Sequence, residues 1–183
     1  AFADLKKEKN LSEEEIANLN TGVVYDRRGT VLLDSTDGRY YAYDLLVRQS
    51  TMHILGDRFG YIPSPMLDEF ADDMIGYNKI TGVYNSADET GELTLSIDAT
   101  AQATALSLLT GRAGTVGVYN YETGEILCAV TSPTYDPDNM PDILGDTTGA
   151  YSGAFVNRFT QSAYTPGSIF KIVTAAAALE HIP

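Results

Sequence analysis

The sequence predicts an α+β fold, in which a β-rich first part is followed by a second part that combines helices with an antiparallel hairpin. Two stretches, 23–33 and 116–130, have apolar strand-like residues on both sides of a polar turn that contains glycine, which is typical of β-hairpins. Two other stretches, 99–110 and 168–179, have the composition and spacing of helices. Hydrophobic residues make up 44% of the 183 residues, enough for an ordinary buried core.

The first predicted elements are a short helix and a hairpin. Ser12 and Glu15 match a capping box, in which each side chain accepts a hydrogen bond from an N–H group at a helix start. This box predicts a helix through about Leu19. The hairpin at 23–33 turns at 26–29, Asp-Arg-Arg-Gly. Its two arginines could form a binding site, but a solvated turn or an ion pair with Asp26 is the better interpretation.

The rest of the first part is predicted to contain a strand and a helix. The apolar run 40–47 predicts a strand, and a helix is expected over about 65–75 after a loop that is rich in glycine and proline. The acidic run 68–73 lacks the spacing of a calcium-binding loop, so it is interpreted as a solvated helix face. We expect a domain boundary near residue 91, which divides the chain into a module at 1–91 and a second part at 92–183.

The second part is predicted to begin with a helix and a hairpin. Asp98 is the expected N-cap of the helix 99–110 and Gly111 its C-cap. The side chains expected to face the core are Ala101, Ala105, Leu108 and Leu109. The hairpin contains the single cysteine, Cys128, in a stretch that reads as a buried strand. One cysteine excludes an internal disulfide, and a buried position favours a small hydrophobic side chain over a reactive thiol.

Composition excludes several classes of function. The formal net charge is −13 and no basic stripe occurs, which argues against a nucleic-acid partner, because phosphate binding needs clustered lysine and arginine. Without clusters of cysteine and histidine, neither a metal site nor a cofactor is expected. The longest apolar run, 172–179, is far shorter than the roughly 18 residues of a membrane span. We therefore expect any membrane anchor to lie outside this chain.

The most informative motif is Ser-x-x-Lys at 168–171, directly before the apolar run. At this helical spacing, the hydroxyl of Ser168 and the amine of Lys171 lie on one face within reach of each other. Pro166 and Gly167 precede the predicted helix, so Ser168 should lie among unpaired N–H groups. A nucleophile, its base and part of an oxyanion hole can share such a turn.

Two further observations favour a catalytic role over a plain helix cap. The apolar neighbours Phe170 and Ile172 should desolvate Lys171 and favour its neutral amine, which is a base. The chain has only two histidines, His53 and His181, so a Ser-His-Asp arrangement has few candidates. From residue chemistry alone, an N-cap serine followed by a lysine that reaches solvent remains an open alternative.

The order of motifs in the second part resembles the start of the transpeptidase domain of penicillin-binding proteins. The segments that carry the resemblance are 95–103, which contains Leu-Ser-Ile-Asp and then Ala-Gln-Ala, the hairpin 114–130, the segment 132–139 (Ser-Pro-Thr-Tyr-Asp-Pro-Asp-Asn), Asn157-Arg158, and 164–171 (Tyr-Thr-Pro-Gly-Ser-Ile-Phe-Lys).

The first part is similar to the class B penicillin-binding proteins in particular. The similar segments are 22–32, His53–Asp57 and Ile75-Gly76, with Thr21 and Arg28 departing from the family pattern. The chain thus resembles the N-terminal portion of such a protein, ending just after the Ser-x-x-Lys motif. The resemblance implies helices packed on an antiparallel sheet in 92–183 and a non-catalytic pedestal, of the type that dimerises, in 1–91.

The resemblance also implies an activity and its residues. Ser168 would be the nucleophile, with its backbone N–H in the oxyanion hole, and Lys171 the general base. The substrates would be the D-Ala-D-Ala stem peptides of peptidoglycan, and β-lactams would acylate the same serine. Two further family motifs, Ser-x-Asn and Lys-Thr/Ser-Gly, are not found here, so we expect the isolated chain to be an inactive fragment. A β-lactam sensor and a serine β-lactamase, which use the same turn, are the alternatives.

Partners and location follow from the same resemblance. We expect the chain to associate with the remaining C-terminal part of the same protein and with proteins of cell-wall synthesis. The expected location is the extracytoplasmic face of the bacterial plasma membrane, with an N-terminal anchor outside these residues.

Overall fold

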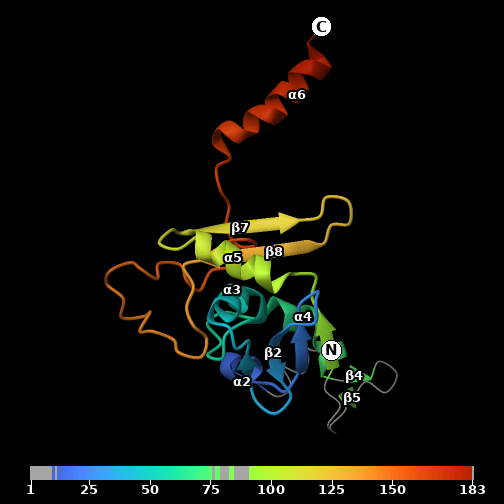
Figure 1. The fold of residues 1–183 in the computed structure, drawn as a ribbon, viewed down its shortest axis with the longest axis vertical. Coiled ribbons are helices and arrows are strands. Elements are labelled where there is room, and N and C mark those ends of the chain that lie inside the picture. The colour runs from blue at the N-terminus through green and yellow to red at the C-terminus, as the bar shows by residue number, and fades with distance from the viewer. Residues whose placement is uncertain (1–9, 11, 76, 79–82, 85–90, 183) are drawn as a thin grey trace.

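The computed structural model describes residues 10, 12–75, 77, 78, 83, 84 and 91–182, and the fold over these residues is α+β, as predicted (Figure 1). The helices are α2 (Glu13–Ala17), α3 (Leu45–Leu55), α4 (Pro65–Met74), α5 (Ala99–Leu108) and α6 (Lys171–His181), the last preceded by a 3-10 turn, η1 (Gly167–Phe170). The strands are β1 (Gly22–Tyr25), β2 (Val31–Ser35), β3 (Tyr40–Tyr41), β4 (Tyr77–Asn78), β5 (Val83–Tyr84), β6 (Gly91–Thr94), β7 (Gly114–Tyr119) and β8 (Ile126–Ser132). Between α4 and the expected domain boundary, residues 76, 79–82 and 85–90 lie outside the described residues.

The strands form a four-stranded sheet in the order β3-β2-β1-β6 and two antiparallel pairs, β4-β5 and β7-β8. Both predicted hairpins are confirmed, because β1 pairs antiparallel with β2, and β7 with β8. Strand β6 runs parallel to β1 at the far edge of the first sheet. Since β6 begins at residue 91, the strand that follows the expected domain boundary belongs to the sheet of the first part.

A buried aspartate ties the first hairpin to the start of α5. The Asp26 carboxylate accepts hydrogen bonds from the N–H groups of Arg28 and Thr30, both at 2.8 Å, and of Ala99, at 3.0 Å. Burial alone would raise the pKa of Asp26, but these N–H donors hold the pKa below its ordinary value. Arg28 reaches Asp98 at 2.8 Å, so the turn arginine pairs with the N-cap of α5 instead of with Asp26.

The predicted N-caps agree with the structure, whereas the C-cap of α5 is Leu109 and not the predicted Gly111. The capping box of Ser12 and Glu15 is confirmed at α2, and Asp98 caps α5 by accepting the N–H groups of Thr100 and Ala101. The predicted helix at 65–75 is confirmed as α4. The predicted strand at 40–47 is wrong beyond Tyr41, because Asp44 accepts the N–H of Val47 and starts α3.

The buried face of α5 differs in part from the predicted one. Leu108 was expected in the core but is 72% exposed, whereas Gln102 is fully buried. Gln102 donates to the Ser50 carbonyl at 3.1 Å and accepts the Ala129 N–H at 2.7 Å. Helix α5 is therefore oriented with the side-chain amide of Gln102 toward α3 and β8. This orientation leaves Leu108 exposed to solvent.

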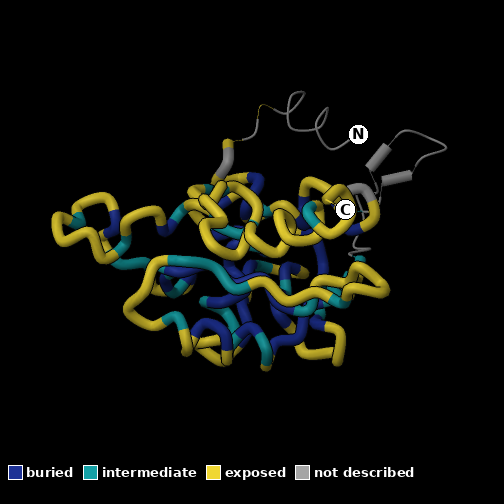
Figure 2. The backbone as a smooth tube through the Cα atoms, turned by 90° about the horizontal axis from the view of Figure 1, so that it is seen from above, coloured by how far each residue is buried: buried dark blue, intermediate teal, exposed yellow. Residues whose placement is uncertain are grey.

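Three apolar clusters fill the body of the molecule, and Figure 2 shows the buried residues gathered there beneath exposed loops. One joins the first sheet and α4 to Ile97 and Ala99, and another packs α5 against β7 and β8 around Cys128. The third brings Met52 and Ile62 together with Tyr135, Ile143 and Ala154. Two of the clusters thus contain residues from both sides of position 91, and the division at that position stays a prediction.

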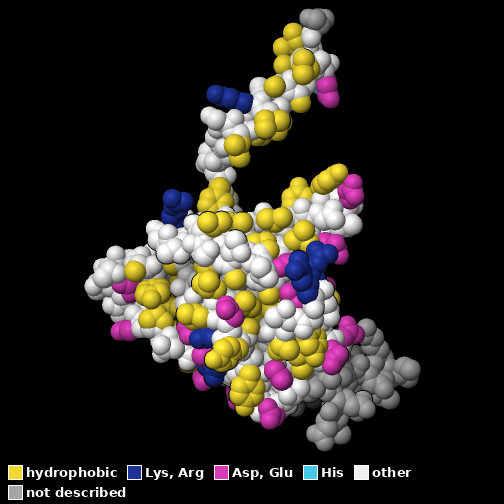
Figure 3. Space-filling view, viewed as in Figure 1, with side chains coloured by type: hydrophobic (Ala, Val, Ile, Leu, Met, Phe, Trp, Pro, Cys, Tyr) yellow, Lys and Arg dark blue, Asp and Glu magenta, His cyan; other side chains and the backbone are white. Residues whose placement is uncertain are grey.

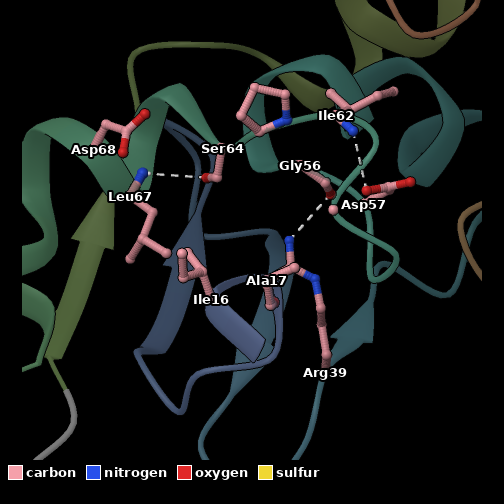
Figure 4. A pocket seen from close by; sticks show the side chains of 11 residues that line it. Ile16, Ala17, Arg39, Gly56, Asp57, Ile62, Ser64, Leu67 and Asp68 are labelled. Carbon is pink, nitrogen blue, oxygen red and sulfur yellow. Dashed lines mark hydrogen bonds between the residues drawn. The ribbon is translucent and has the colours of Figure 1, made fainter. Parts of the chain in front are cut away.

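A small cavity of about 20 Å³ lies between α2, α3 and α4 (Figure 4). Arg39 points into it and donates to the Gly56 carbonyl, while Asp57 accepts the Ile62 N–H on its far side. A volume of this size holds about one water molecule. The cavity is therefore part of the packing around Asp57 and too small for a substrate.

We predict that Asp26→Asn lowers the free energy of unfolding by about 2 kcal/mol near neutral pH, because an amide cannot accept all of the buried N–H groups. Since the pKa of Asp26 is lowered by folding, its contribution is complete above the ordinary aspartate pKa of about 3.9 and is lost as the pH falls through the folded value. Urea unfolding at several pH values should show the difference from the unchanged protein shrinking below about pH 4. Asp37→Asn, in an exposed turn, is the control, and an equal loss there would contradict the role of Asp26.

Candidate active site

The structure places Ser168 in η1 and Lys171 at the first position of α6, one turn further on. Gly167 has a φ of +57°, which a glycine adopts without strain, and Pro166 precedes it. The first N–H groups of a helix have no partner within it, so the serine lies where a developing negative charge can be bound. The predicted helix start and the spacing of the two side chains are thus present.

The apolar surroundings expected for Lys171 are not supplied by the described residues. Phe170 and Ile172 are 54% and 76% exposed, and Lys171 itself is exposed. Helix α6 stands away from the body of the molecule, so none of the elements in Figure 1 covers it. Within the described part of the chain, no hydrogen bond involves Ser168 Oγ or Lys171 Nζ. The expected desolvation would require another segment of protein over this turn.

The loop that leads from β8 to this serine is anchored on the first part of the chain. Tyr135 is buried and donates its hydroxyl to Asp57 Oδ2 at 2.6 Å. Burial raises the pKa of Tyr135, and the Asp57 carboxylate raises it further, so the phenol stays protonated and acts as the donor. The same carboxylate accepts the Ile62 N–H at 3.2 Å.

Two arginines of the first part hold the next residues of the loop. Arg48 binds the Asp136 carboxylate with two hydrogen bonds of 2.8 Å, and Arg58 pairs with Asp138. The hydrogen bond from Arg48 holds the pKa of Asp136 below its ordinary value although burial opposes this. A bidentate arginine–carboxylate pair fixes orientation as well as distance, so these contacts set the path of the loop.

His53 is a structural residue in this arrangement. Its Nε2 lies 2.8 Å from the Ala154 carbonyl, and its own carbonyl accepts the Asn157 side-chain N–H at 3.0 Å. Burial lowers the pKa of His53 and favours the neutral ring, and because a carbonyl only accepts, Nε2 carries the proton. The histidine therefore holds the far end of the loop and is not part of a Ser-His-Asp arrangement.

The Asn157-Arg158 pair closes the loop against β8. The Arg158 N–H donates to Thr131 Oγ1 at 3.1 Å, and Asn157 Oδ1 accepts the N–H groups of the two residues that follow Arg158. The ring of Phe159 then lies over β7 at Gly117, where an added Cβ would come within 2.2 Å of the ring. A larger residue at Gly117 would require the Phe159 ring to move.

Sequence reasoning named His53–Asp57 and 132–139 as separate motifs, and the structure brings them together. It did not single out Arg48 or Arg58, because isolated charged residues in a sequence are usually surface positions.

No three histidine, cysteine, aspartate or glutamate side chains among the described residues are grouped as a metal site would need. In the same residues no helix has the length and apolar character needed to cross a bilayer.

Residues 114–181 match the family model of the penicillin binding protein transpeptidase domain, so the predicted resemblance is confirmed over this segment. The D,D-transpeptidase domain of a peptidoglycan glycosyltransferase from Eggerthella lenta has 26% identity and a TM-score of 0.64, over 89% of this chain and 37% of that one. No match was found among curated protein sequences.

Two further solved structures are less than 25% identical and show a shared fold. They are the penicillin-binding protein PBP2 from Helicobacter pylori (16% identity, TM-score 0.62, 90% of this chain and 53% of that one) and PBP2 from Pseudomonas aeruginosa in complex with WCK 5153 (22%, 0.56, 88% and 40%). The chain thus spans between 37% and 53% of the length of these three structures.

We predict a coupling energy of about 1 kcal/mol between Arg48 and Asp136 in a double-mutant cycle with Arg48→Gln and Asp136→Asn, because the pair is bidentate and only 19% and 17% exposed. The measurement is the free energy of unfolding in urea for the four proteins. The matched control cycle is Arg28→Gln with Asp98→Asn, whose arginine is 70% exposed and whose coupling should stay below about 0.5 kcal/mol. Equal coupling in the two cycles would mean that the loop is not fixed through Arg48.

Proposed function

We propose that this chain carries the nucleophile and the base of a serine D,D-transpeptidase that cross-links the D-Ala-D-Ala stem peptides of peptidoglycan. The observation that carries the proposal is the turn of Ser168 and Lys171, one helical turn apart, inside the segment that matches the transpeptidase domain. The likeness to D,D-transpeptidase structures over most of the chain supports it, and it also favours a transpeptidase over a β-lactam sensor or a β-lactamase.

In this proposal the neutral amine of Lys171 takes the proton of the Ser168 hydroxyl as Oγ attacks the carbonyl carbon of the penultimate D-Ala. The N–H of Ser168 helps to hold the oxyanion of the tetrahedral intermediate, since the first turn of η1 leaves such groups without helix partners. The C–N bond then breaks, the terminal D-Ala leaves with a proton, and an ester with Ser168 remains.

An amine of a neighbouring stem peptide attacks this ester and forms the cross-link, which returns the serine to its free form. A β-lactam carbonyl meets the same nucleophile, and opening of its ring leaves the acyl group on Ser168. The chemistry belongs to the extracytoplasmic face of the plasma membrane, where stem peptides and proteins of cell-wall synthesis are the partners.

The exposed apolar side chains of η1 and α6 support the presence of a further segment over the active turn in the intact protein. Ile169, Val173 and Leu179 are 72%, 55% and 86% exposed, and Figure 3 shows hydrophobic side chains along α6 and on the part of the body beside it. Apolar surface of this extent is ordinarily buried. We propose that the remainder of the transpeptidase domain covers it, supplies the Ser-x-Asn and Lys-Thr/Ser-Gly motifs, and desolvates Lys171.

We predict that Ser168→Ala abolishes labelling of the intact protein by a fluorescent penicillin, because no other described serine lies one helical turn from a lysine. Lys171→Arg should slow acylation by about 1000-fold or more, since an arginine stays charged and cannot accept the serine proton. The measurement is the rate of label incorporation, with the adduct mapped by mass spectrometry.

Ser107→Ala, an exposed serine on α5, is the matched control and should label at the unchanged rate. Thermal unfolding of each variant separates a lost reaction from a lost fold. Labelling of Ser168→Ala protein, or an adduct on another residue, would sink the proposed function.

A further inference from the structure

A second, larger cavity lies between the connection from α5 to β7 and the anchored loop. Its volume is about 460 Å³, and its lining residues are Gly111, Arg112, Ala113, Ser132, Pro133, Gly149, Ala150, Ser152 and Arg158. None of these is Ser168, Lys171 or a residue of the Asp57 contacts. The space is sufficient for a ligand of several non-hydrogen atoms.

Two arginines line this cavity, and neither has a carboxylate partner among the described residues, where the ion-paired arginines are Arg28, Arg48 and Arg58. Arg158 donates from Nη2 to the Ser152 carbonyl at 2.9 Å, and its buried Nε has no acceptor. Arg112 has an exposed side chain. In a chain with a net charge of −13, two unpaired arginines at one cavity form a local site of positive charge.

The rest of the lining consists mostly of small residues, which leave open space beside the two arginine side chains. Glycine, alanine and serine residues make up most of it, and a Cβ added at the adjacent Gly153 would lie 2.5 Å from Arg158 Nη2. Two acidic residues of the same loop are already engaged, because Asp142 accepts the Gly145 N–H and Asp146 accepts the N–H groups of Thr148 and Tyr151. Neither of these two carboxylates forms an ion pair with Arg158, the arginine of the same loop.

We propose that this cavity is a binding site for the carboxylate groups of a short acidic peptide. A guanidinium group presents planar pairs of N–H donors that match a carboxylate, and two of them suit a peptide with neighbouring carboxylates. The volume of about 460 Å³ leaves room for a short peptide segment. The proposal concerns binding and is independent of the acyl transfer at Ser168.

The test is fluorescence anisotropy with the intact protein carrying Ser168→Ala, so that binding is measured without acylation. The probe is a fluorescein-labelled peptide, Ala-Glu-Glu-Ala, and its matched control is Ala-Gln-Gln-Ala. We expect the glutamate peptide to bind at least about tenfold more tightly than the glutamine peptide, because a charge-assisted hydrogen bond is lost with each amide.

Arg112→Gln and Arg158→Gln should each weaken binding of the glutamate peptide by about tenfold, whereas Arg27→Gln, an exposed arginine in the β1–β2 turn, should leave it unchanged. Arg112 is exposed, so its substitution keeps the test valid if the Arg158 variant does not fold. Glutarate should displace the peptide more effectively than inorganic phosphate. Equal binding of the two peptides, equal loss in the Arg27 variant, or stronger competition by phosphate would overturn the proposal.

Discussion

The hydrogen bond from Tyr135 to Asp57 is the contact on which the arrangement of the second part most depends. Asp57 is completely buried, and a carboxylate out of water must be held by donors; its oxygens accept the Ile62 N–H and the Tyr135 hydroxyl. With Tyr135 fixed, the following residues lie within reach of Arg48 and Arg58. A buried charge in the first part thus determines the path of a loop from the second.

This constraint ends before the proposed active turn. The loop is held from Thr134, whose hydroxyl donates to the Gln49 carbonyl, to Arg158, which is bonded to β8. Beyond it, η1 and α6 extend away from the body with exposed side chains. The first part therefore fixes the chain as far as Arg158. In our proposal the remainder of the transpeptidase domain positions the turn of Ser168 and completes its surroundings.

The sequence correctly predicted the features that depend on interactions between residues close together in the chain. Both hairpins, the caps at Ser12 and Asp98, and the serine and lysine one turn apart follow from short-range patterns. The errors arose where partners distant in sequence decide: the strand expected at 40–47 gives way to α3, and Leu108 is exposed because Gln102 bonds to Ser50 and Ala129. The contacts of Asp57 were equally out of reach, since a sequence does not reveal which loop will meet a buried carboxylate.

Hydrogen–deuterium exchange of the intact protein with Tyr135→Phe tests the dependence of the loop on Asp57 most directly. Phenylalanine keeps the ring in its apolar cluster and removes only the hydroxyl that donates to Asp57. We predict faster exchange in peptides covering 134–157, with protection in β7 and β8 unchanged, because local opening follows the loss of specific contacts. Unchanged exchange in 134–157 would contradict the account and show that the loop is held without this hydrogen bond.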